Sequence, residues 1–238
     1  MRRRRVRLAQ VRSGRLRVAP EEAHHLARVL RVRPGDRVQA FDGSGLEAEG
    51  RVVHVADGEV EVELGPPGVS PREATLSLTL AVALLKGDKL AQVTRQATEL
   101  GVAALQPFVA ARCDVPRLSP GKLTRLRRVA AEAAKQSGRA RVPEVHDAVP
   151  LTELGWEGAC WVADPAAERG IDAATDRLAA EGAEALTVVT GPEGGLSAEE
   201  TAGLAARGAW TVRFGPRVLR AETAPVALAA AVLARVDA

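Results

Sequence analysis

From residue 75 onward the chain alternates short apolar runs with helix-like segments, and this alternation restricts its possible folds more than any other feature. Residues 75–85 form a nearly continuous apolar run, as expected of a strand buried on both faces of a sheet. The strands expected after it are residues 102–109, 159–163, 186–190 and 210–214. The helices expected between and after these strands are residues 88–100, 120–136, a segment ending at 180, a segment that begins with a capping box at 197–200, and residues 224–236. This order predicts a mostly parallel sheet in an α/β domain.

The first 64 residues show a different, β-rich pattern. Apolar positions alternate from Val6 to Val18 around Ser13-Gly14, which predicts a hairpin, and a short helix is expected over residues 20–30. The Asp57-Gly58 pair lies between two alternating runs and predicts a second hairpin. Half a dozen short strands in a segment of this length predict a small β-barrel.

A segment dense in glycine and proline separates these two patterns. Residues 65–71 read GPPGVSP, and this composition disfavours both helix and strand. We therefore expect a linker here and two domains, one of residues 1–68 and one of residues 72–238.

Two glycine-rich stretches in the second domain are the first candidates for a functional site. They read TGPEGGLS over residues 190–197 and FGPRVLRAET over residues 214–223. Each follows an expected strand and precedes an expected helix, so both expose backbone N–H and C=O groups at carboxyl ends of strands. That is where an α/β sheet builds a small-molecule pocket, although Gly-Pro also occurs as simple turn punctuation. The chain lacks GxGxxG after its first expected sheet strand and lacks the P-loop and GxSxG motifs, which disfavours the enzymes that those motifs mark.

Charge is segregated along the chain although the net charge is only +3. Residues 1–40 carry net +9 and residues 86–141 carry net +8, whereas residues 41–70 carry −6 and residues 142–238 carry −8. Such concentration favours a polyanion-binding surface, with solvated arginine faces as the alternative. Only four of the 33 basic residues are lysines, and arginine is the better ligand for phosphate and stacked bases, which favours nucleic acid.

Other residue types argue against several protein classes. Cys113 and Cys160 are isolated, and the four histidines show no metal-ligand spacing, so we expect neither a disulfide nor a metal site. No apolar run is long enough to span a bilayer, and the arginine-rich N-terminus does not resemble a secretory signal. We expect a cytoplasmic protein without a membrane partner.

Segments along most of the chain resemble one family. The glycine-rich stretches match its two signature loops, and residues 96–102 (QATELGV), 131–139 (AEAAKQSGR) and 142–144 (VPE) match further segments. Residues 25–35 (HLARVLRVRPG) and 41–44 (FDGS) resemble its N-terminal domain. On these matches the chain resembles the ribosomal RNA small subunit methyltransferase E family, within the SPOUT superfamily.

The resemblance implies a fold and an activity. The fold would be a small N-terminal PUA-like β-barrel joined to a C-terminal SPOUT-type α/β domain with a trefoil knot. The activity would be transfer of a methyl group from S-adenosylmethionine to N3 of a specific uridine in 16S ribosomal RNA within the small ribosomal subunit. Members act as homodimers with the active site near the subunit interface, and the reaction needs no metal.

The resemblance also implies roles for individual residues. Arg220 is the leading catalytic candidate, with ion pairing to Glu222 as its alternative role. The catalytic candidates are Arg220, Glu193 and Glu222. The expected cofactor-binding residues are Ala163, Thr190, Gly191, Pro192, Glu193, Gly194, Phe214, Gly215, Val218, Leu219, Ala221 and Thr223. The expected RNA-binding residues are Arg2, Arg3, Arg4, Arg5, Arg28, Arg31, Gln136 and Arg139, and Glu99 is a further residue that could face the substrate.

Three alternatives remain open at this point. The first is a non-catalytic RNA-binding protein on the same scaffold. The second is a ribose 2′-O-methyltransferase of the same superfamily, but such enzymes usually carry an asparagine–arginine motif, and this chain has no asparagine. The third is an α/β enzyme acting on a small anionic metabolite, which leaves the basic N-terminal segment without a purpose.

Overall fold

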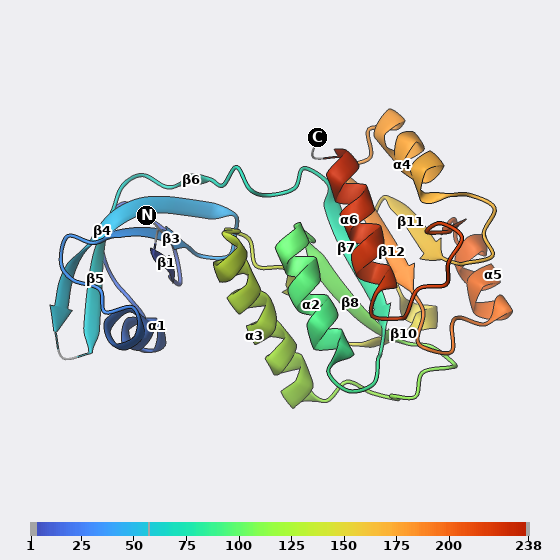
Figure 1. Ribbon diagram of the computed structural model, residues 1–238, viewed down its shortest axis with the longest axis horizontal. Helices are drawn as coiled ribbons and strands as arrows, with labels where there is room; N and C mark the ends of the chain where they lie inside the picture. The colour runs from blue at the N-terminus through green and yellow to red at the C-terminus, as the bar shows by residue number, and fades with distance from the viewer. Residues whose placement is uncertain (1–3, 57, 237–238) are drawn as a thin grey trace. The chain divides into compact units, whose positions relative to one another are not determined.

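A computed structural model describes residues 4–56 and 58–236 (Figure 1). The chain forms two compact units. The first comprises residues 1–73 together with residues 134–142, and the second comprises residues 74–133 and 143–238. Residues 134–142, which the sequence places in its second domain, thus pack with the first unit.

The first unit is built on a six-stranded sheet. Its strands are β1 (Arg4–Arg7), β2 (Gly14–Arg17), β3 (Arg37–Phe41), β4 (Leu46–Ala56), β5 (Glu59–Leu64) and β6 (Gly68–Val69). They run in the order β1-β3-β4-β5-β2, and β6 pairs with β4. One apolar core gathers residues from these strands around Leu26, which belongs to a short helical segment made of α1 (Pro20–His24) and a π-helical turn, η1 (His25–Val29).

The strand pairing confirms one expected hairpin and corrects the other. Strands β4 and β5 pair antiparallel on either side of the Asp57-Gly58 turn signal. Strands β1 and β2 do not form the expected hairpin around Ser13-Gly14, because β1 pairs in parallel with β3 and β2 pairs with β5. The expected linker also contributes to the sheet through β6. Local alternation identified these strands, but their partners are distant in sequence.

A buried ion pair holds residues 134–142 in the first unit. The Arg139 guanidinium donates to Glu73 Oε2 at 2.8 and 3.0 Å, and the two side chains are 4% and 11% exposed. Glu73 Oε1 accepts from the backbone N–H groups of Ala140 and Arg141. Lys135 Nζ lies 2.6 Å from Glu22 Oε2 within the same unit. One carboxylate therefore anchors the chain just after α3 (Pro120–Ser137).

The second unit is a seven-stranded parallel sheet with helices on both faces. Its strands are β7 (Ser77–Ala83), β8 (Ala104–Val109), β9 (Glu144–Val145), β10 (Val149–Pro150), β11 (Ala159–Ala163), β12 (Ala185–Thr190) and β13 (Trp210–Val212). Its other helices are α2 (Lys89–Leu100), the 3₁₀ turn η2 (Leu151–Glu153), α4 (Ile171–Ala180), α5 (Ala198–Ala206) and α6 (Ala224–Val236). The alternation predicted from the sequence is confirmed, and the short strands β9 and β10 are additions.

The strand order decides where the two glycine-rich stretches meet. The order is β10-β8-β7-β12-β11-β13, so β11 lies between the strands that carry the two stretches. All pairs are parallel, hence the carboxyl ends of β12, β11 and β13 lie at one edge of the sheet. Residues 190–197 and 214–223 are thus close in space but do not follow adjacent strands.

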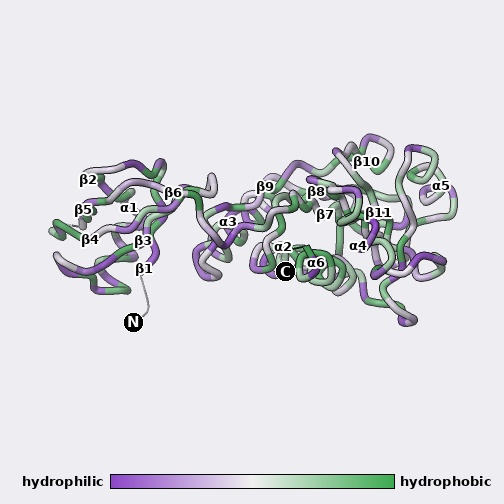
Figure 2. Tube along the Cα trace, turned by 90° about the horizontal axis from the view of Figure 1, so that it is seen from above, coloured by the Kyte–Doolittle hydropathy of each residue, from purple (hydrophilic) through white to green (hydrophobic). Residues whose placement is uncertain are grey.

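Helix placement follows from the burial pattern. Helices α2 and α6 pack against each other over one face of the sheet (Figure 1). The apolar sequence of α6 colours its trace hydrophobic in Figure 2, and Leu228, Val232 and Leu233 are buried. On the opposite face, Leu204 of α5 joins a core that includes Ala81 and Phe108. No helix in residues 4–56 and 58–236 has the length and apolar character required to cross a membrane.

Candidate functional site

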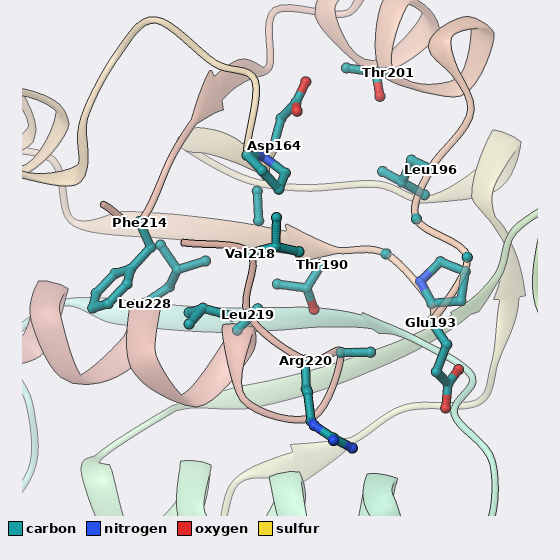
Figure 3. Close-up of a pocket in the computed structure, with 18 of the residues that line it drawn as sticks. Asp164, Thr190, Glu193, Leu196, Thr201, Phe214, Val218, Leu219, Arg220 and Leu228 are labelled. Atoms are coloured by element: carbon teal, nitrogen blue, oxygen red, sulfur yellow. The ribbon is translucent and has the colours of Figure 1, made fainter. Parts of the chain in front are cut away.

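A cavity of about 820 Å³ opens at the carboxyl ends of β12, β11 and β13. This volume lies in the range of sites for cofactors and other small molecules. Residues 190–196 line one side, residues 217–222 line another, and Ala163 and Asp164 come from the end of β11 between them (Figure 3). The cavity is the place where the sequence predicts a pocket.

The first loop, residues 190–197, is fixed by its own turn and by the loop after β8. The Gly195 N–H donates to the Pro192 carbonyl at 2.9 Å, and Ser197 with Glu200 forms the expected capping box at the start of α5. Glu200 also accepts from the Ala111 N–H at 2.7 Å. A Cβ at Gly191 would lie 3.0 Å from the Leu196 nitrogen, so a side chain at this position would force the neighbouring backbone to shift.

The second loop, residues 214–223, supplies an apolar wall. Phe214 and Leu219 lie close to Leu228 of α6 in Figure 3, and all three line the cavity. The Thr223 and Ala224 N–H groups both donate to the Arg220 carbonyl at 2.9 Å, which turns the chain into α6. Val218 is 80% exposed at the rim. This side of the cavity suits a flat apolar group.

Lys89, the first residue of α2, joins both loops at the cavity. Its Nζ is 2.9 Å from Glu193 Oε1 in the first loop and 3.2 Å from Glu222 Oε2 in the second. Glu193 also accepts from the Lys86 N–H at 3.4 Å. One cation therefore serves two carboxylates that come from different loops.

These contacts set the ionisation of both carboxylates. Desolvation alone would raise the pKa of Glu193, but hydrogen bonds from Lys89 and from backbone N–H groups outweigh it and lower this pKa. The pKa of Glu222 is lowered chiefly by its own backbone N–H, with Lys89 adding to the effect. The hydrogen bond to Glu193 and the ion pair with Glu222 raise the pKa of Lys89. All three groups are thus charged between about pH 5 and pH 10.

Arg220 differs from Lys89 because its side chain is unengaged. It is exposed, and its guanidinium makes no ion pair or hydrogen bond with any residue in the part of the chain that the structure describes. Arg220 forms no ion pair with Glu222, which pairs with Lys89 instead, although the charge of Arg220 contributes to lowering the pKa of Glu222. Figure 3 shows the Arg220 side chain extending from the loop at the side of the cavity where Glu193 lies. Arg220 is available to a bound molecule.

Thr190 provides a second unsatisfied group. It is 1% exposed, and its hydroxyl oxygen has no hydrogen-bond partner although the residue lines the cavity. A buried hydroxyl without a partner is costly, so a ligand that pairs with it would recover that cost.

The cavity brings together most of the residues expected to bind a cofactor. Ten of the twelve line it, and Gly215 and Thr223 do not. The three catalytic candidates, Arg220, Glu193 and Glu222, also line it. Lining residues that the sequence did not indicate are Lys89, Asp164, Pro165, Gly195, Leu196, Ala198, Thr201, Ala202, Ala205, Val212, Arg217, Ala224 and Leu228. The sequence contained a signal for Lys89, because a lysine in the first turn of a helix opposes the helix dipole and therefore indicates a partner elsewhere.

The residues expected to bind RNA divide into three groups. Arg2 and Arg3 lie outside the described residues. Arg28, Arg31 and Gln136 are exposed, and neither arginine has a partner among the described residues, whereas Arg4 pairs with Asp36.

Arg5 and Arg139 are engaged inside the first unit. Arg5 donates to Gln39 at 2.8 Å and to the Arg139 carbonyl at 2.7 Å, and Arg139 binds Glu73 as described above. Their guanidiniums hold this unit together, so a direct contact with RNA is not supported for these two. Glu99 is exposed on α2 and does not line the cavity.

Comparison with known proteins gives consistent matches. Residues 72–233 match a family described as RNA methyltransferase domain, and residues 18–65 match one described as RNA methyltransferase PUA domain. The chain is 33% identical over 219 residues to ribosomal RNA small subunit methyltransferase E of Bacillus subtilis, which covers 88% of this chain and 86% of that protein. It is 36% identical over 216 residues to the Mycobacterium bovis protein of the same name, with 86% and 80% covered.

Two solved structures resemble the whole chain. One is ribosomal RNA small subunit methyltransferase E from Neisseria gonorrhoeae bound to S-adenosyl methionine, with 28% identity, a TM-score of 0.84, and 97% and 96% of the two chains covered. The other is described as a methyltransferase from Legionella pneumophila in complex with the bound cofactor SAM. It has 27% identity to this chain and a TM-score of 0.84, and 98% of each chain is covered.

Proposed function

Since this chain belongs to the ribosomal RNA small subunit methyltransferase E family, we propose that it methylates N3 of a specific uridine in 16S ribosomal RNA. It uses S-adenosylmethionine as its cofactor, and ribosomal RNA methylation is its activity. The observation that carries the finer proposal is an unpaired arginine, Arg220, at the rim of the cavity formed by the two signature loops.

The cavity fits the cofactor in its chemistry. The apolar wall of Phe214, Leu219 and Leu228 suits the adenine ring, and the unpartnered Thr190 hydroxyl offers a polar contact. Glycine at position 191 keeps the backbone accessible. The carboxylates in the lining are Asp164, Glu193 and Glu222, and the last two already pair with Lys89. When bound, S-adenosylmethionine supplies an electrophilic methyl group.

The protein's chemical task is then to favour the deprotonated uridine. The N3–H of uracil is a weak acid, so a nearby cation that stabilises the imide anion promotes its loss of the proton. The Arg220 guanidinium forms no ion pair or hydrogen bond with a described residue, and we assign it this role. Glu193 and Glu222 are weak proton acceptors, because their pKa values are lowered and both carboxylates bind Lys89. We assign these two to shaping the cavity instead.

Several properties complete the proposal. We propose that the enzyme works as a homodimer in the cytoplasm, that its C-terminal loops are threaded as the trefoil knot of SPOUT enzymes, and that no metal takes part. Exposed arginines of the first unit, including Arg28 and Arg31, would contact the RNA phosphates. A molar mass of about 50 kDa in light scattering, twice the 25.0 kDa of the chain, is the expected sign of the dimer.

The decisive experiment is nucleoside analysis of methylated RNA. Purified protein is incubated with S-adenosylmethionine and with small ribosomal subunits, or free 16S RNA, from a strain that lacks this activity. The expected result is one new 3-methyluridine per RNA, mapped by mass spectrometry to a single fragment. A 2′-O-methylated nucleoside instead would assign the enzyme to the ribose-modifying class. Binding of RNA without any methyl incorporation would contradict an enzymatic role.

A further inference from the structure

Lys89 forms ion pairs with both signature loops, and no other side chain in the described residues does so. Its two carboxylate partners, Glu193 and Glu222, come from loops that follow different strands. Because their oxygens lie 2.9 and 3.2 Å from the same nitrogen, they are at most 6.1 Å apart. Two like charges at such a distance repel each other unless a cation lies between them.

The position of Lys89 in its helix indicates that this cation is not there to stabilise α2. It occupies the first turn, where a positive charge opposes the helix dipole, and this turn contains no acidic residue. The preceding Asp88 makes no side-chain cap either, because Arg125 binds its carboxylate at 2.5 and 3.0 Å. The start of α2 is electrostatically unfavourable by itself, and the contacts of Lys89 with the two loops offset this.

The exposure of the three groups supports the same view. The side chains of Lys89, Glu193 and Glu222 are 32%, 27% and 15% exposed, so the ion triad lies at the cavity mouth rather than in a core. Ion pairs at this exposure contribute little to global stability. Their effect is local, on the distance between the two loops that form the cavity walls.

We propose that Lys89 is a positioning residue that sets the separation of the two signature loops and thereby the affinity for S-adenosylmethionine. It acts through Glu193 and Glu222, not through contact with the reacting atoms. This inference rests on the cofactor of the family and is independent of which uridine atom is methylated. Its test therefore measures cofactor binding in the absence of RNA.

The principal variant is Lys89→Met, which keeps the length of the side chain and removes its charge. We expect the Kd for S-adenosylmethionine, measured by isothermal titration calorimetry, to rise at least tenfold because the two carboxylates then repel each other. The matched control is Lys86→Met, three residues earlier, whose lysine pairs with exposed Asp114 at 2.9 Å and does not line the cavity. Its Kd should stay within twofold of the wild-type value.

Two readouts separate positioning from a general structural role. Lys89→Arg should restore the affinity to within about threefold, because a longer cation still bridges both carboxylates. In methyl-transfer assays, Lys89→Met should raise KM for the cofactor while kcat at saturation changes less than about threefold. If Lys89→Met does not fold, Lys89→Gln serves in its place, and a Kd increase of at least fivefold is expected.

The proposal is overturned by wild-type cofactor affinity in Lys89→Met, or in Lys89→Gln where that variant is used. It is also overturned by a loss of kcat with unchanged Kd, which would place Lys89 at the reacting atoms. Failure of the uridine-N3 assignment would appear only in the nucleoside analysis and would leave these binding results intact.

Discussion

Lys89, Arg217 and Arg220 are the cationic side chains that line the cavity, and the different surroundings of Lys89 and Arg220 separate the roles of these two. Lys89 is bound by two carboxylates, whereas Arg220 is exposed with no partner among the described residues. A charge that is already neutralised stabilises a developing anion poorly, so the free guanidinium is the better candidate for this task.

We predict that Arg220→Ala lowers kcat by about 10²–10³-fold, as expected when a donor to a developing anion is removed. The Kd for S-adenosylmethionine should change less than about threefold, because the variant leaves the apolar wall and the ion triad in place. Single-turnover methylation of 16S RNA and calorimetry measure the two quantities. Arg95→Ala, an exposed arginine of α2, is the control and should leave both unchanged. Equal activity of Arg220→Ala and wild-type protein would refute the assignment.

At the scale of the element, the sequence predicted the order of strands and helices but not all of their partners. Apolar periodicity identified β7 to β13 apart from the short β9 and β10, and Gly101 and Ser197 fixed a helix end and a helix start. The insertion of β12 between β7 and β11 could not be read from local pattern, because any of these strands is apolar enough to occupy the centre. The hairpin expected at Ser13-Gly14 was wrong because a local turn signal does not determine which strands pair: β1 pairs with β3, and β2 pairs with β5.

The candidate site shows the same limit. The two glycine-rich stretches have a local signature, so most cavity residues within them were predicted correctly as neighbours. Asp164 and Leu228 reach the cavity only because β11 and α6 are placed beside the two loops in space. Lys89 had an electrostatic signal at its helix start, but its partners are more than 100 positions away, at 193 and 222.

The chain just after α3 is held in the first unit by one carboxylate, Glu73. We predict that Glu73→Gln lowers the free energy of unfolding by about 2 kcal/mol at pH 7, because the buried Arg139 guanidinium loses the negative charge of Glu73. Chemical denaturation measures this difference. The control is Glu63→Gln, which breaks a pair with Arg51 whose side chains are 46% and 65% exposed and should cost less than about 1 kcal/mol.

The effect of Glu73→Gln should also depend on pH. Desolvation raises the pKa of Glu73, but hydrogen bonds from Arg141, Arg139 and Ala140 outweigh it and lower the pKa below the ordinary value of 4.5. Its stabilising contribution is therefore complete above about pH 4.5 and is lost as the pH falls through the lowered pKa. The gap between variant and wild type should narrow on acidification. A gap that stays constant down to pH 3 would show that the charge of Glu73 is not what matters.

At the scale of the whole molecule, folding redistributes the charge seen along the sequence. The acidic segment 41–70 supplies a strand that pairs with the basic N-terminal segment, so Arg15 and Arg17 face Glu61 and Glu59. Within the acidic segment, Arg51 pairs with Glu63. These pairs neutralise part of the expected basic surface. The first unit nevertheless contains 17 basic and 11 acidic residues, net +6, whereas the second unit is net −3. The positive excess resides in arginines without acidic partners, of which Arg28 and Arg31 are two.

This distribution allows a test of where RNA binds. We predict that Arg28→Ala with Arg31→Gly weakens binding of 16S RNA about tenfold at 150 mM salt, because two phosphate contacts and their released counterions are lost. Glycine is chosen at position 31 since Arg31 has a φ of +50°, which glycine adopts without strain. The slope of log K against log salt concentration should fall in magnitude by about 1–2, while the affinity for S-adenosylmethionine stays the same.

The matched control removes two arginines of the same unit that are already paired, Arg15→Ala with Arg51→Ala. Both double variants change the net charge by the same amount, so a general electrostatic attraction would weaken RNA binding equally in the two. Because Glu61 and Glu63 already neutralise Arg15 and Arg51, we expect less than a threefold effect in the control. Equal losses would mean that RNA senses only the overall charge of the unit, and the specific contact by Arg28 and Arg31 would have to be abandoned.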